Sequence, residues 1–402
     1  MRRFLSTRRA ARYTSSSVAP DLKTIRTDHT GALRRPEWLN DLYERLGEGD
    51  ASAGEVREGQ ERAVREVIAK QESLGLPVVT DGEFCRIGGF QESFGGAVSG
   101  FDAQPYVFRS RAAQATASAR ARPGEAPHRI ETGLSGPGTA IYNRLPTKER
   151  LRLVRNLIAE EYERASKFAG LPVKVTLIGP DRISQRFEYE SSRDVYPDMD
   201  AFLEDVVAIE RQMIAEAVAA GCRYIQIDEP GYTAYVDPPL LKQMRDRGED
   251  ADANLERSIR ADNAIIAGFP GVTFGVHICR GNSGGRGGAG WHREGSYDEI
   301  AERLFTQLNF DRFLLEYDSE QAGSFEALRY FPRDKVAVLG LLSNHGEVET
   351  PEYLHRRLEE ASHFIELDQA ALCPRCGFGS ADEEVQWAKF AVMQQVATEV
   401  WG

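Results

Sequence analysis

Short apolar runs alternate with long amphipathic segments through most of this 402-residue chain, and no other feature restricts the possible folds as much. We expect the short runs to be buried strands and the long segments to be helices, from the spacing of their apolar residues. The expected strands are residues 24–29, 77–83, 173–178, 224–230, 272–279, 312–317, 335–342 and 369–373. Strand and helix alternating eight times predicts a parallel (β/α)8 TIM barrel. A doubly wound open sheet is the alternative, but only a barrel brings the ends of five or more strands to one mouth.

The expected helices rest on apolar residues that recur at helical spacing. One helix covers about residues 56–74, and another covers about 200–220, with Gly221 at the position that commonly follows a helix. The helix before the third strand is expected from a one-sided apolar set, namely Leu151, Val154, Leu157, Ile158, Tyr162, Ala165 and Phe168.

Two segments do not fit the alternation. The segment of residues 84–147 is too long for a simple loop. Between positions 109 and 129 it contains five arginines but only one acidic residue, Glu125. This insertion is either a lid that presents positive charge over the barrel mouth or a solvated excursion. Residues 1–22 are rich in arginine and serine, which is typical of a transit peptide, a disordered arm or an over-long start. Residues 23–402 then form one barrel domain.

Composition excludes several classes of protein. The net charge of −12 argues against nucleic acid as the main partner. No run of 18 apolar residues is present, so we expect no membrane span. Five cysteines are a low, odd count that favours metal-binding or catalytic thiols in a reducing compartment over disulfides. We expect a cytoplasmic protein, or one of the mitochondrial matrix if the first residues are a transit peptide.

A histidine and a cysteine end the fifth expected strand. His277 and Cys279 project from the same side because side chains alternate along a strand. Cys373 and Cys376 offer further thiolates after the last strand, and Glu316 ends the sixth. Imidazole, thiolate and carboxylate are the usual ligands of Zn²⁺, so the sequence predicts a zinc site gathered from separate strand ends. The alternatives are ordinary core packing, or a closed structural site made by the histidine and three thiols.

An exchangeable carboxylate would give such a site a chemical use. A substrate thiol could displace the oxygen ligand, lose its proton and remain nucleophilic as a metal-bound thiolate. Glu83 and Asp228 end two other expected strands, where carboxylates are suited to hold a cationic group such as an α-ammonium. Helix N-capping by Asp81 or Asp228 is the alternative. The glycine-rich run at 281–288 lacks the ending of a phosphate loop and is expected to be a flexible rim.

Several motifs occur together in an order that resembles the catalytic domain of cobalamin-independent methionine synthase. The closest likeness is to its short single-barrel relatives, often labelled methionine synthase II, and it covers the chain from about Ile25 onward. The motifs are Thr80-Asp81-Gly82-Glu83-Phe84, Ile227-Asp228-Glu229-Pro230, His277-Ile278-Cys279-Arg280-Gly281-Asn282, Leu314-Leu315-Glu316-Tyr317-Asp318, Leu339-Gly340-Leu341-Leu342 and Cys376-Gly377-Phe378.

The resemblance implies zinc-dependent alkyl transfer to a thiol on a TIM barrel. It implies that the zinc ligands are His277, Cys279, Glu316 and Cys376. It also implies that Glu83 and Asp228 hold the amino group of homocysteine, and that a thiolate attacks the methyl carbon of a methyl donor in line.

Some positions depart from the family pattern. Gly31-Ala32 replaces a Gly-Ser pair near the amino-acid site. Residues 181–187 lack the tryptophan that stacks on the pterin in the long enzymes. The amino-terminal half of those long enzymes has no counterpart in this sequence. The seventh strand ends in Ser343-Asn344-His345-Gly346 in place of a Thr/Ser-Lys pattern. The methyl donor, folate or another compound, is therefore left open.

We accordingly expect a zinc-dependent S-methyltransferase that converts homocysteine to methionine. Near the substrate we place Gly31, with Arg280 or Asn282 meeting a carboxylate or polar group. His345 is the candidate proton acceptor, with a supporting role as its alternative. Competing functions are addition of a coenzyme M-type thiol to an epoxide and a non-catalytic zinc-stabilised barrel. The expected partners are a small thiol and a methyl donor, with neither nucleic acid nor membrane, and a homodimer is allowed for.

Overall fold

Six parallel strands form the centre of the molecule. The computed structural model describes residues 21–87, 89–102, 146–280, 293, 295–319, 322–379 and 381–402. The strands pair in chain order, and every residue in them is buried, as expected for a parallel sheet covered by helices. They are β3 (Lys174–Ile178), β4 (Tyr224–Asp228), β5 (Thr273–Ile278), β6 (Arg312–Glu316), β7 (Val336–Leu342) and β8 (Ala370–Pro374).

The first two expected strands are not regular strands, and that prediction was wrong. Segment 24–29 makes one parallel bridge, from Thr27 to Leu372 of β8, and segment 77–83 makes one from Val79 to Val173 beside β3. Pro77 lacks an N–H, and Gly31 and Gly82 adopt positive φ, so extended pairing stops early in both segments.

The two segments nevertheless flank the two edges of the six-stranded sheet. The backbone N–H of Leu33 donates to the carbonyl of Gly82 at 3.1 Å, and the Thr80 hydroxyl donates to the carbonyl of Gly31 at 3.0 Å. Each edge of the six-stranded sheet therefore has a parallel neighbour, and the neighbours contact each other. The architecture is that of a (β/α)8 barrel with an insertion after the second segment, as the sequence predicted.

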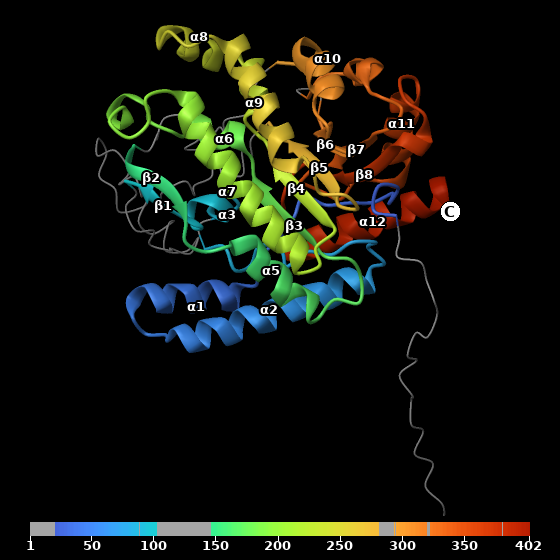
Figure 1. The fold of residues 1–402 in the computed structure, drawn as a ribbon. Helices are drawn as coiled ribbons and strands as arrows, with labels where there is room; N and C mark the ends of the chain where they lie inside the picture. Colours follow the sequence, from blue (N-terminus) through green and yellow to red (C-terminus); the bar gives the residue numbers. More distant parts are fainter. Residues whose placement is uncertain are drawn as a thin grey trace, which may run out of the picture.

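Helices surround the sheet, and Figure 1 shows α1 and α2 lying side by side at one end of it. The helices are α1 (Glu37–Glu48), α2 (Ala53–Ser73), α3 (Glu92–Gly95), α5 (Leu157–Ser166), α6 (Pro180–Gln185), α7 (Met199–Ala219), α8 (Pro238–Asp246), α9 (Ala251–Ile266), α10 (Asp298–Gln307), α11 (Pro351–Ser362) and α12 (Glu383–Trp401). Short 3-10 turns are η1 (Glu190–Ser192), η2 (Tyr232–Tyr235), η4 (Phe325–Tyr330) and η5 (Leu367–Gln369). Among the described helices, none is both long and apolar enough to cross a membrane.

The helix predicted before β3 is shorter than expected. Leu151 belongs to β2 (Thr147–Leu153), which pairs antiparallel with β1 (Val98–Phe101), and Val154 is 65% exposed. The helix α5 begins only at Leu157, because Asn156 caps it by accepting from the Ala159 N–H. The predictions for α2 and α7 are confirmed, and Gly221 has a φ of 114°.

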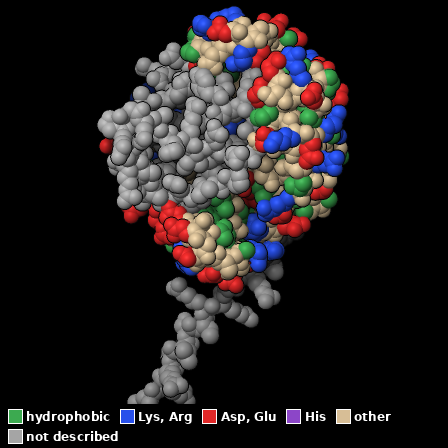
Figure 2. All heavy atoms as spheres, turned by 90° about the vertical axis from the view of Figure 1, so that its left-hand side faces the viewer, with side chains coloured by type: hydrophobic (Ala, Val, Ile, Leu, Met, Phe, Trp, Pro, Cys, Tyr) green, Lys and Arg blue, Asp and Glu red, His purple; other side chains and the backbone are tan. Residues whose placement is uncertain are grey.

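The insertion is bounded by the β1–β2 pair. Its described part holds α3 and β1, and the excursion returns along β2 as far as Leu153, beyond the expected end at 147. Its arginine-rich part, 109–129, lies outside the described residues, as do residues 1–20 of the expected arm. The lid role stays a prediction. On the face in Figure 2, acidic and basic side chains of the described residues are interspersed.

Candidate metal centre and substrate site

Three side chains expected to bind a metal lie together at the carboxyl ends of β5 and β8. The ligand atoms of His277, Cys279 and Cys376 all fall within 4.8 Å of one another. His277 lies in β5 and Cys279 directly follows it, while Cys376 lies two residues beyond β8. Since His277 and Cys279 are separated by one residue, strand alternation aims both at the same place.

The two thiols make this group suited to a divalent cation. The Sγ atoms of Cys279 and Cys376 are 3.7 Å apart, which is far longer than a disulfide bond, and both cysteines are free. The hydrogen bond between the thiols, followed by burial, raises the pKa of Cys376 well above its ordinary value. Two crowded sulfurs and an imidazole are the donor set that zinc prefers, so the residues present fit this ion.

Asp228 orients the imidazole. Its Oδ1 lies 3.1 Å from Nδ1 of His277 and also accepts from the Gln226 amide at 2.7 Å. Burial lowers the pKa of His277, but the hydrogen bond to Asp228 and the charge of Cys279 outweigh it, so the net shift is upward. A carboxylate on Nδ1 is common for histidines that bind zinc through Nε2. Here Nε2 lies 3.3 Å from the Arg375 carbonyl, a contact that a metal ion would replace.

Glu316 lies next to the three ligands but is held by other groups. Its Oε2 accepts from the backbone N–H of Arg280 at 2.8 Å, and its Oε1 pairs with Nη2 of Arg375 at 2.9 Å. Its negative charge contributes to the raised pKa of Cys376, which places it near the thiols. Metal binding by Glu316 stays a prediction, and it requires the carboxylate to leave Arg375.

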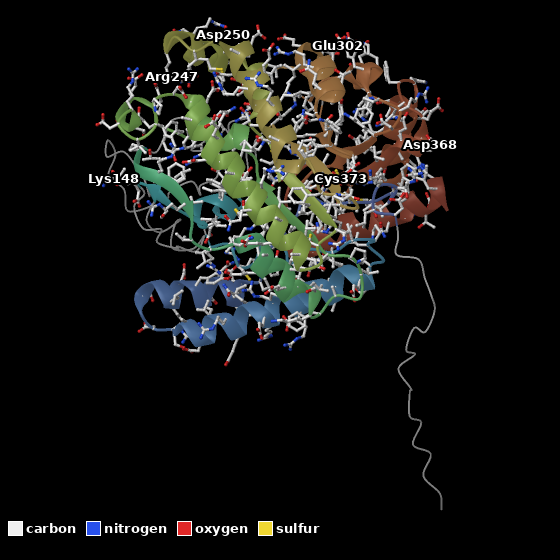
Figure 3. The ribbon with its side chains drawn as sticks, viewed as in Figure 1. Lys148, Arg247, Asp250, Glu302, Asp368 and Cys373 are labelled. Atoms are coloured by element: carbon white, nitrogen blue, oxygen red, sulfur yellow. The ribbon has the colours of Figure 1, made fainter. Side chains whose placement is uncertain are left out.

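Cys373 takes no part in this group. It is 1% exposed, packs with Leu314, Val336, Val338 and Ala371, and donates weakly to the Val338 carbonyl. Figure 3 labels it in the interior of the ribbon, in contrast to Arg247 and Glu302 at the periphery. The closed structural site that would have used both Cys373 and Cys376 is therefore not assembled.

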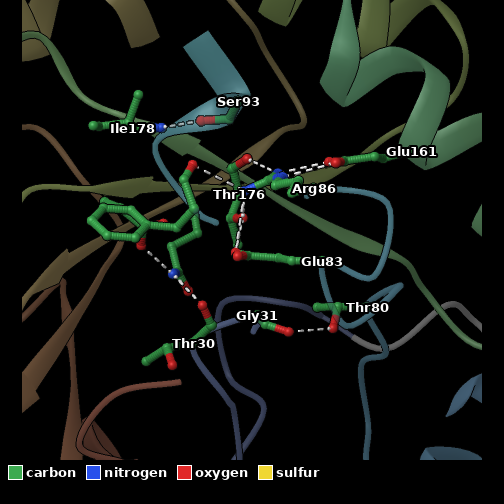
Figure 4. Close-up of polar contacts among 12 residues, drawn as sticks. Thr30, Gly31, Thr80, Glu83, Arg86, Ser93, Glu161, Thr176 and Ile178 are labelled. Atoms are coloured by element: carbon green, nitrogen blue, oxygen red, sulfur yellow. Dashed lines mark hydrogen bonds and ion pairs between the residues drawn. The ribbon is translucent and has the colours of Figure 1, made fainter. Parts of the chain in front are cut away.

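Glu83 occupies a strained position beside β3. Its φ of 58° lies in the left-handed region, which costs a non-glycine residue about 1–2 kcal/mol. Its Oε1 accepts from the Thr176 hydroxyl at 2.8 Å and pairs with Arg86 at 3.2 Å (Figure 4). Burial raises its pKa to about 7, although the charge of Arg86 opposes the shift.

Gly31 allows the chain to pass close to this carboxylate. Its φ is 104°, and a Cβ atom there would lie 2.6 Å from Cγ2 of Thr176 and 3.1 Å from Oε1 of Glu83. The negative charge of Asp228 also raises the pKa of Glu83, so these two acids are electrostatic neighbours. Gly31 therefore adjoins Glu83, and Asp228 influences the same carboxylate through its charge. Binding of an amino group by Glu83 and Asp228 stays a prediction.

The other predicted substrate residues are less directly placed. The guanidinium of Arg280 is fully buried, donates to the carbonyls of Gly295 and Ala322, and lies 4.5 Å from the ring of Tyr297. Asn282 lies outside the described residues. His345 lies on the turn after β7, where Lys389 donates to its carbonyl. The roles proposed for these three residues stay predictions.

Sequence reasoning missed two arginines that shape the site. Arg375 pairs with both Glu316 and Asp318, at 2.9 and 3.0 Å. Arg86 pairs with Glu83 and makes two hydrogen bonds to Glu161, at 2.8 and 2.6 Å. Their positions near motif acids, three residues after Glu83 and directly before Cys376, are the signal that could have identified them.

No family model matches the chain. The uncharacterized protein YxjG of Bacillus subtilis is 32% identical, with 94% of this chain and 95% of YxjG covered. A protein named methionine synthase from Pyrococcus abyssi is 22% identical, with 93% and 92% covered.

Two solved structures share the fold. The putative vitamin-B12 independent methionine synthase of Listeria monocytogenes has a TM-score of 0.69 and 24% identity, covering 96% of this chain and 99% of its own. A B12-independent methionine synthase from Shewanella, in complex with selenomethionine, has a TM-score of 0.66 and 20% identity, covering 94% and 98%. This chain belongs to the same family as YxjG, and it resembles the short, cobalamin-independent methionine synthases in sequence and in fold.

Proposed function

We propose that this protein is a zinc-dependent methyltransferase that transfers a methyl group to the thiol of homocysteine and yields methionine. The single observation that carries the proposal is the convergence of His277, Cys279 and Cys376 within 4.8 Å. The archaeal relatives named methionine synthase support the reaction class, and the Shewanella structure holds a selenium analogue of the expected product.

His277, Cys279 and Cys376 would hold the zinc, and Glu316 is the candidate fourth ligand. When bound, the zinc would lower the pKa of an incoming thiol, so that the thiol is deprotonated at neutral pH. Asp228 fixes the imidazole of His277 through a hydrogen bond of 3.1 Å. Arg375, which pairs with Glu316 at 2.9 Å, offers that carboxylate a stable place away from the thiols.

Glu83 and Asp228 would bind the ammonium group of homocysteine. Glu83 is preset by the hydroxyl of Thr176 and by Arg86, so its Oε1 is already fixed before the amino acid arrives. Both acids are buried, which strengthens their attraction for a cation relative to water. This arrangement positions the substrate with its ammonium at the acids and its thiol toward the cysteines, as in-line attack on a methyl carbon requires.

X-ray absorption at the zinc edge, with and without homocysteine, tests the proposal. We expect homocysteine to add one sulfur scatterer and remove one oxygen scatterer, because the thiol replaces Glu316. The variant Glu316→Gln provides a matched control, since its weaker oxygen ligand should reduce the oxygen signal before homocysteine is added. A zinc shell that homocysteine leaves unchanged would contradict the proposal, as would a full-length protein that retains no zinc.

A further inference from the structure

A second cluster of charged residues lies beside the metal group, at the carboxyl ends of β3, β4 and β5. It contains three buried arginines, Arg182, Arg186 and Arg293, which are 2%, 0% and 2% exposed. Arg182 and Arg186 stand one turn apart on α6 and its C-cap, the spacing that places two side chains on one helix face. Arginines are seldom buried in this way unless they are paired.

The arginine cluster contacts the cysteine end of the metal group. Nη1 of Arg293 donates to the Thr233 hydroxyl at 2.8 Å, and that hydroxyl donates to the carbonyl of Cys279 at 2.9 Å. The backbone N–H of Arg293 also donates to the carbonyl of Arg280 at 3.1 Å. A ligand held by Arg293 would therefore lie near the backbone of Cys279, one of the proposed metal ligands.

Two nitrogen atoms of the Arg182 guanidinium lack hydrogen-bond acceptors. Within the described part of the chain, its Nε and Nη1 are buried and have no hydrogen-bond partner. Leaving such donors unpaired costs about 1–3 kcal/mol or more. Burial, together with the positive charges of Arg186 and Arg293, lowers the pKa of Arg182 well below its ordinary value, although the charges of Asp181 and Glu229 oppose the shift. A bound anion would reduce the repulsion among the three arginines.

The neighbouring carboxylates are occupied by other donors. Asp181 accepts from the hydroxyls of Tyr235 and Ser258, at 2.8 and 2.6 Å, and from the Gln185 amide at 3.0 Å. Glu229 accepts the backbone N–H groups of Asp181 and Arg182, at 2.8 and 3.0 Å. Among the described residues, neither acid forms an ion pair with the Arg182 side chain, which leaves its Nε and Nη1 available to a bound anion.

We infer that Arg182, with Arg186 and Arg293, forms an oxyanion-binding site for a substrate of the methyl transfer. This inference rests on the proposed function for the identity of the reaction but not for the binding of the anion. The oxyanion is a carboxylate, phosphate or sulfonate carried either by the methyl donor or by homocysteine itself. Three buried arginines would repel a sulfonium or quaternary ammonium donor, so the site selects against cationic methyl donors.

Sulfate binding to the zinc-loaded full-length protein tests the site by calorimetry at constant ionic strength. We expect saturable binding of one sulfate per chain, weakened about tenfold or more in Arg182→Met by loss of a charge-assisted hydrogen bond. Arg62→Gln, on the exposed surface of α2, should bind sulfate like the wild type. Arg182→Met should also raise the melting temperature without ligand, because it removes a buried unpaired charge. Absent sulfate binding in the wild type, or unchanged binding in Arg182→Met, would overturn the inference.

Two further measurements cover the other outcomes. If Arg182→Met does not fold, Arg186→Gln takes its place with the same criterion for sulfate. To identify the source of the oxyanion, homocysteine is compared with 3-mercaptopropylamine, which lacks the carboxylate. If Arg182→Met weakens the binding of homocysteine but not of 3-mercaptopropylamine, the site is assigned to the carboxylate of homocysteine. If Arg182→Met leaves the affinity of both thiols unchanged, the site is assigned to the methyl donor. Zinc content and homocysteine binding in the wild type report separately on the proposed function.

Discussion

Cys279 and Cys376 are 97 residues apart in the chain, yet their Sγ atoms lie 3.7 Å from each other. Parallel strands in a barrel end at the same mouth, so residues that follow β5 and β8 can bind the same metal ion. Two thiols at this separation repel each other once ionised, and a divalent cation removes that repulsion. Removing either thiol of this pair should therefore reduce metal binding more than any other change at the site.

Cys279→Ser should abolish both zinc retention and methyl transfer, because it removes one of the three converging ligands. Cys373→Ser is the matched control, since that thiol is buried in the neighbouring core cluster and lies outside the metal group. We expect the control to retain zinc, with a modest loss of stability. Zinc content by atomic absorption, measured after dialysis, checks both variants. Loss of zinc from Cys373→Ser would show that Cys373, and not Cys376, is the metal ligand after β8.

Homocysteine binding should depend on pH through Glu83. Burial raises the pKa of Glu83 to about 7. Below that pH the carboxyl group is mostly protonated and offers no charge to an ammonium, so affinity should fall about tenfold per pH unit. Above pH 7 the contribution of Glu83 should level off, so that only the ionisation of the thiol still changes the affinity. The measurement is the dissociation constant of homocysteine between about pH 6 and pH 8.

4-Mercaptobutanoate, which lacks the amino group, is the matched ligand for this experiment. Its binding shares the ionisation of the thiol but not the contact with Glu83, so the Glu83-dependent slope should be missing. In Glu83→Gln the two ligands should show the same pH dependence, while zinc content stays unchanged. A homocysteine slope that survives in Glu83→Gln would rule out this carboxylate as the ammonium partner.

The sequence predicted the central strands well because fully buried parallel strands are continuous apolar runs. All six, β3 to β8, lie within two residues of their expected bounds. The same logic failed at Leu151 and Val154, where apolar spacing suited a helix but the chain pairs with β1 instead. The spacing of apolar residues within a segment carries no information about a partner strand about 50 residues away, beyond a long insertion.

The candidate site was predictable where one element decides the geometry, and hidden where two elements meet. His277 and Cys279 share a side of one strand, so their convergence follows from alternation alone. The contacts of Arg86 with Glu161 and of Arg375 with Glu316 join residues 75 and 59 positions apart. Such contacts depend on tertiary packing that the sequence pattern does not specify, which is why the arginines were not assigned.

Gly31→Ala should destabilise the protein and weaken homocysteine binding. The new Cβ atom would lie 2.6 Å from Thr176 Cγ2 in a backbone with φ of 104°, so both strain and displacement are expected. We estimate a loss of about 1–3 kcal/mol in the free energy of unfolding. Gly54→Ala within α2 is the control and should stabilise slightly, because alanine favours helices. Equal stability of the two variants in urea would contradict the close approach at Gly31.

Arg86→Met should be the most destabilising of these changes. Arg86 is 1% exposed and pairs with both Glu83 and Glu161, so its removal leaves two buried acids without their cation. Breaking a buried pair from one side costs about 3–5 kcal/mol. The surface pair Lys242–Asp246 provides the control, and Lys242→Met should change stability by less than about 1 kcal/mol.

The double variant Arg86→Met with Glu161→Leu separates the cost of an unpaired acid from the value of the pair itself. Removing Glu161 together with its partner leaves only Glu83 uncompensated, so most of the stability lost in Arg86→Met should return. Homocysteine binding should not return with it, because Glu83 still lacks the cation that fixes its Oε1. Urea unfolding and homocysteine titration of the same samples measure the two effects. If binding recovers along with stability, Arg86 supports the fold alone and has no part in positioning Glu83.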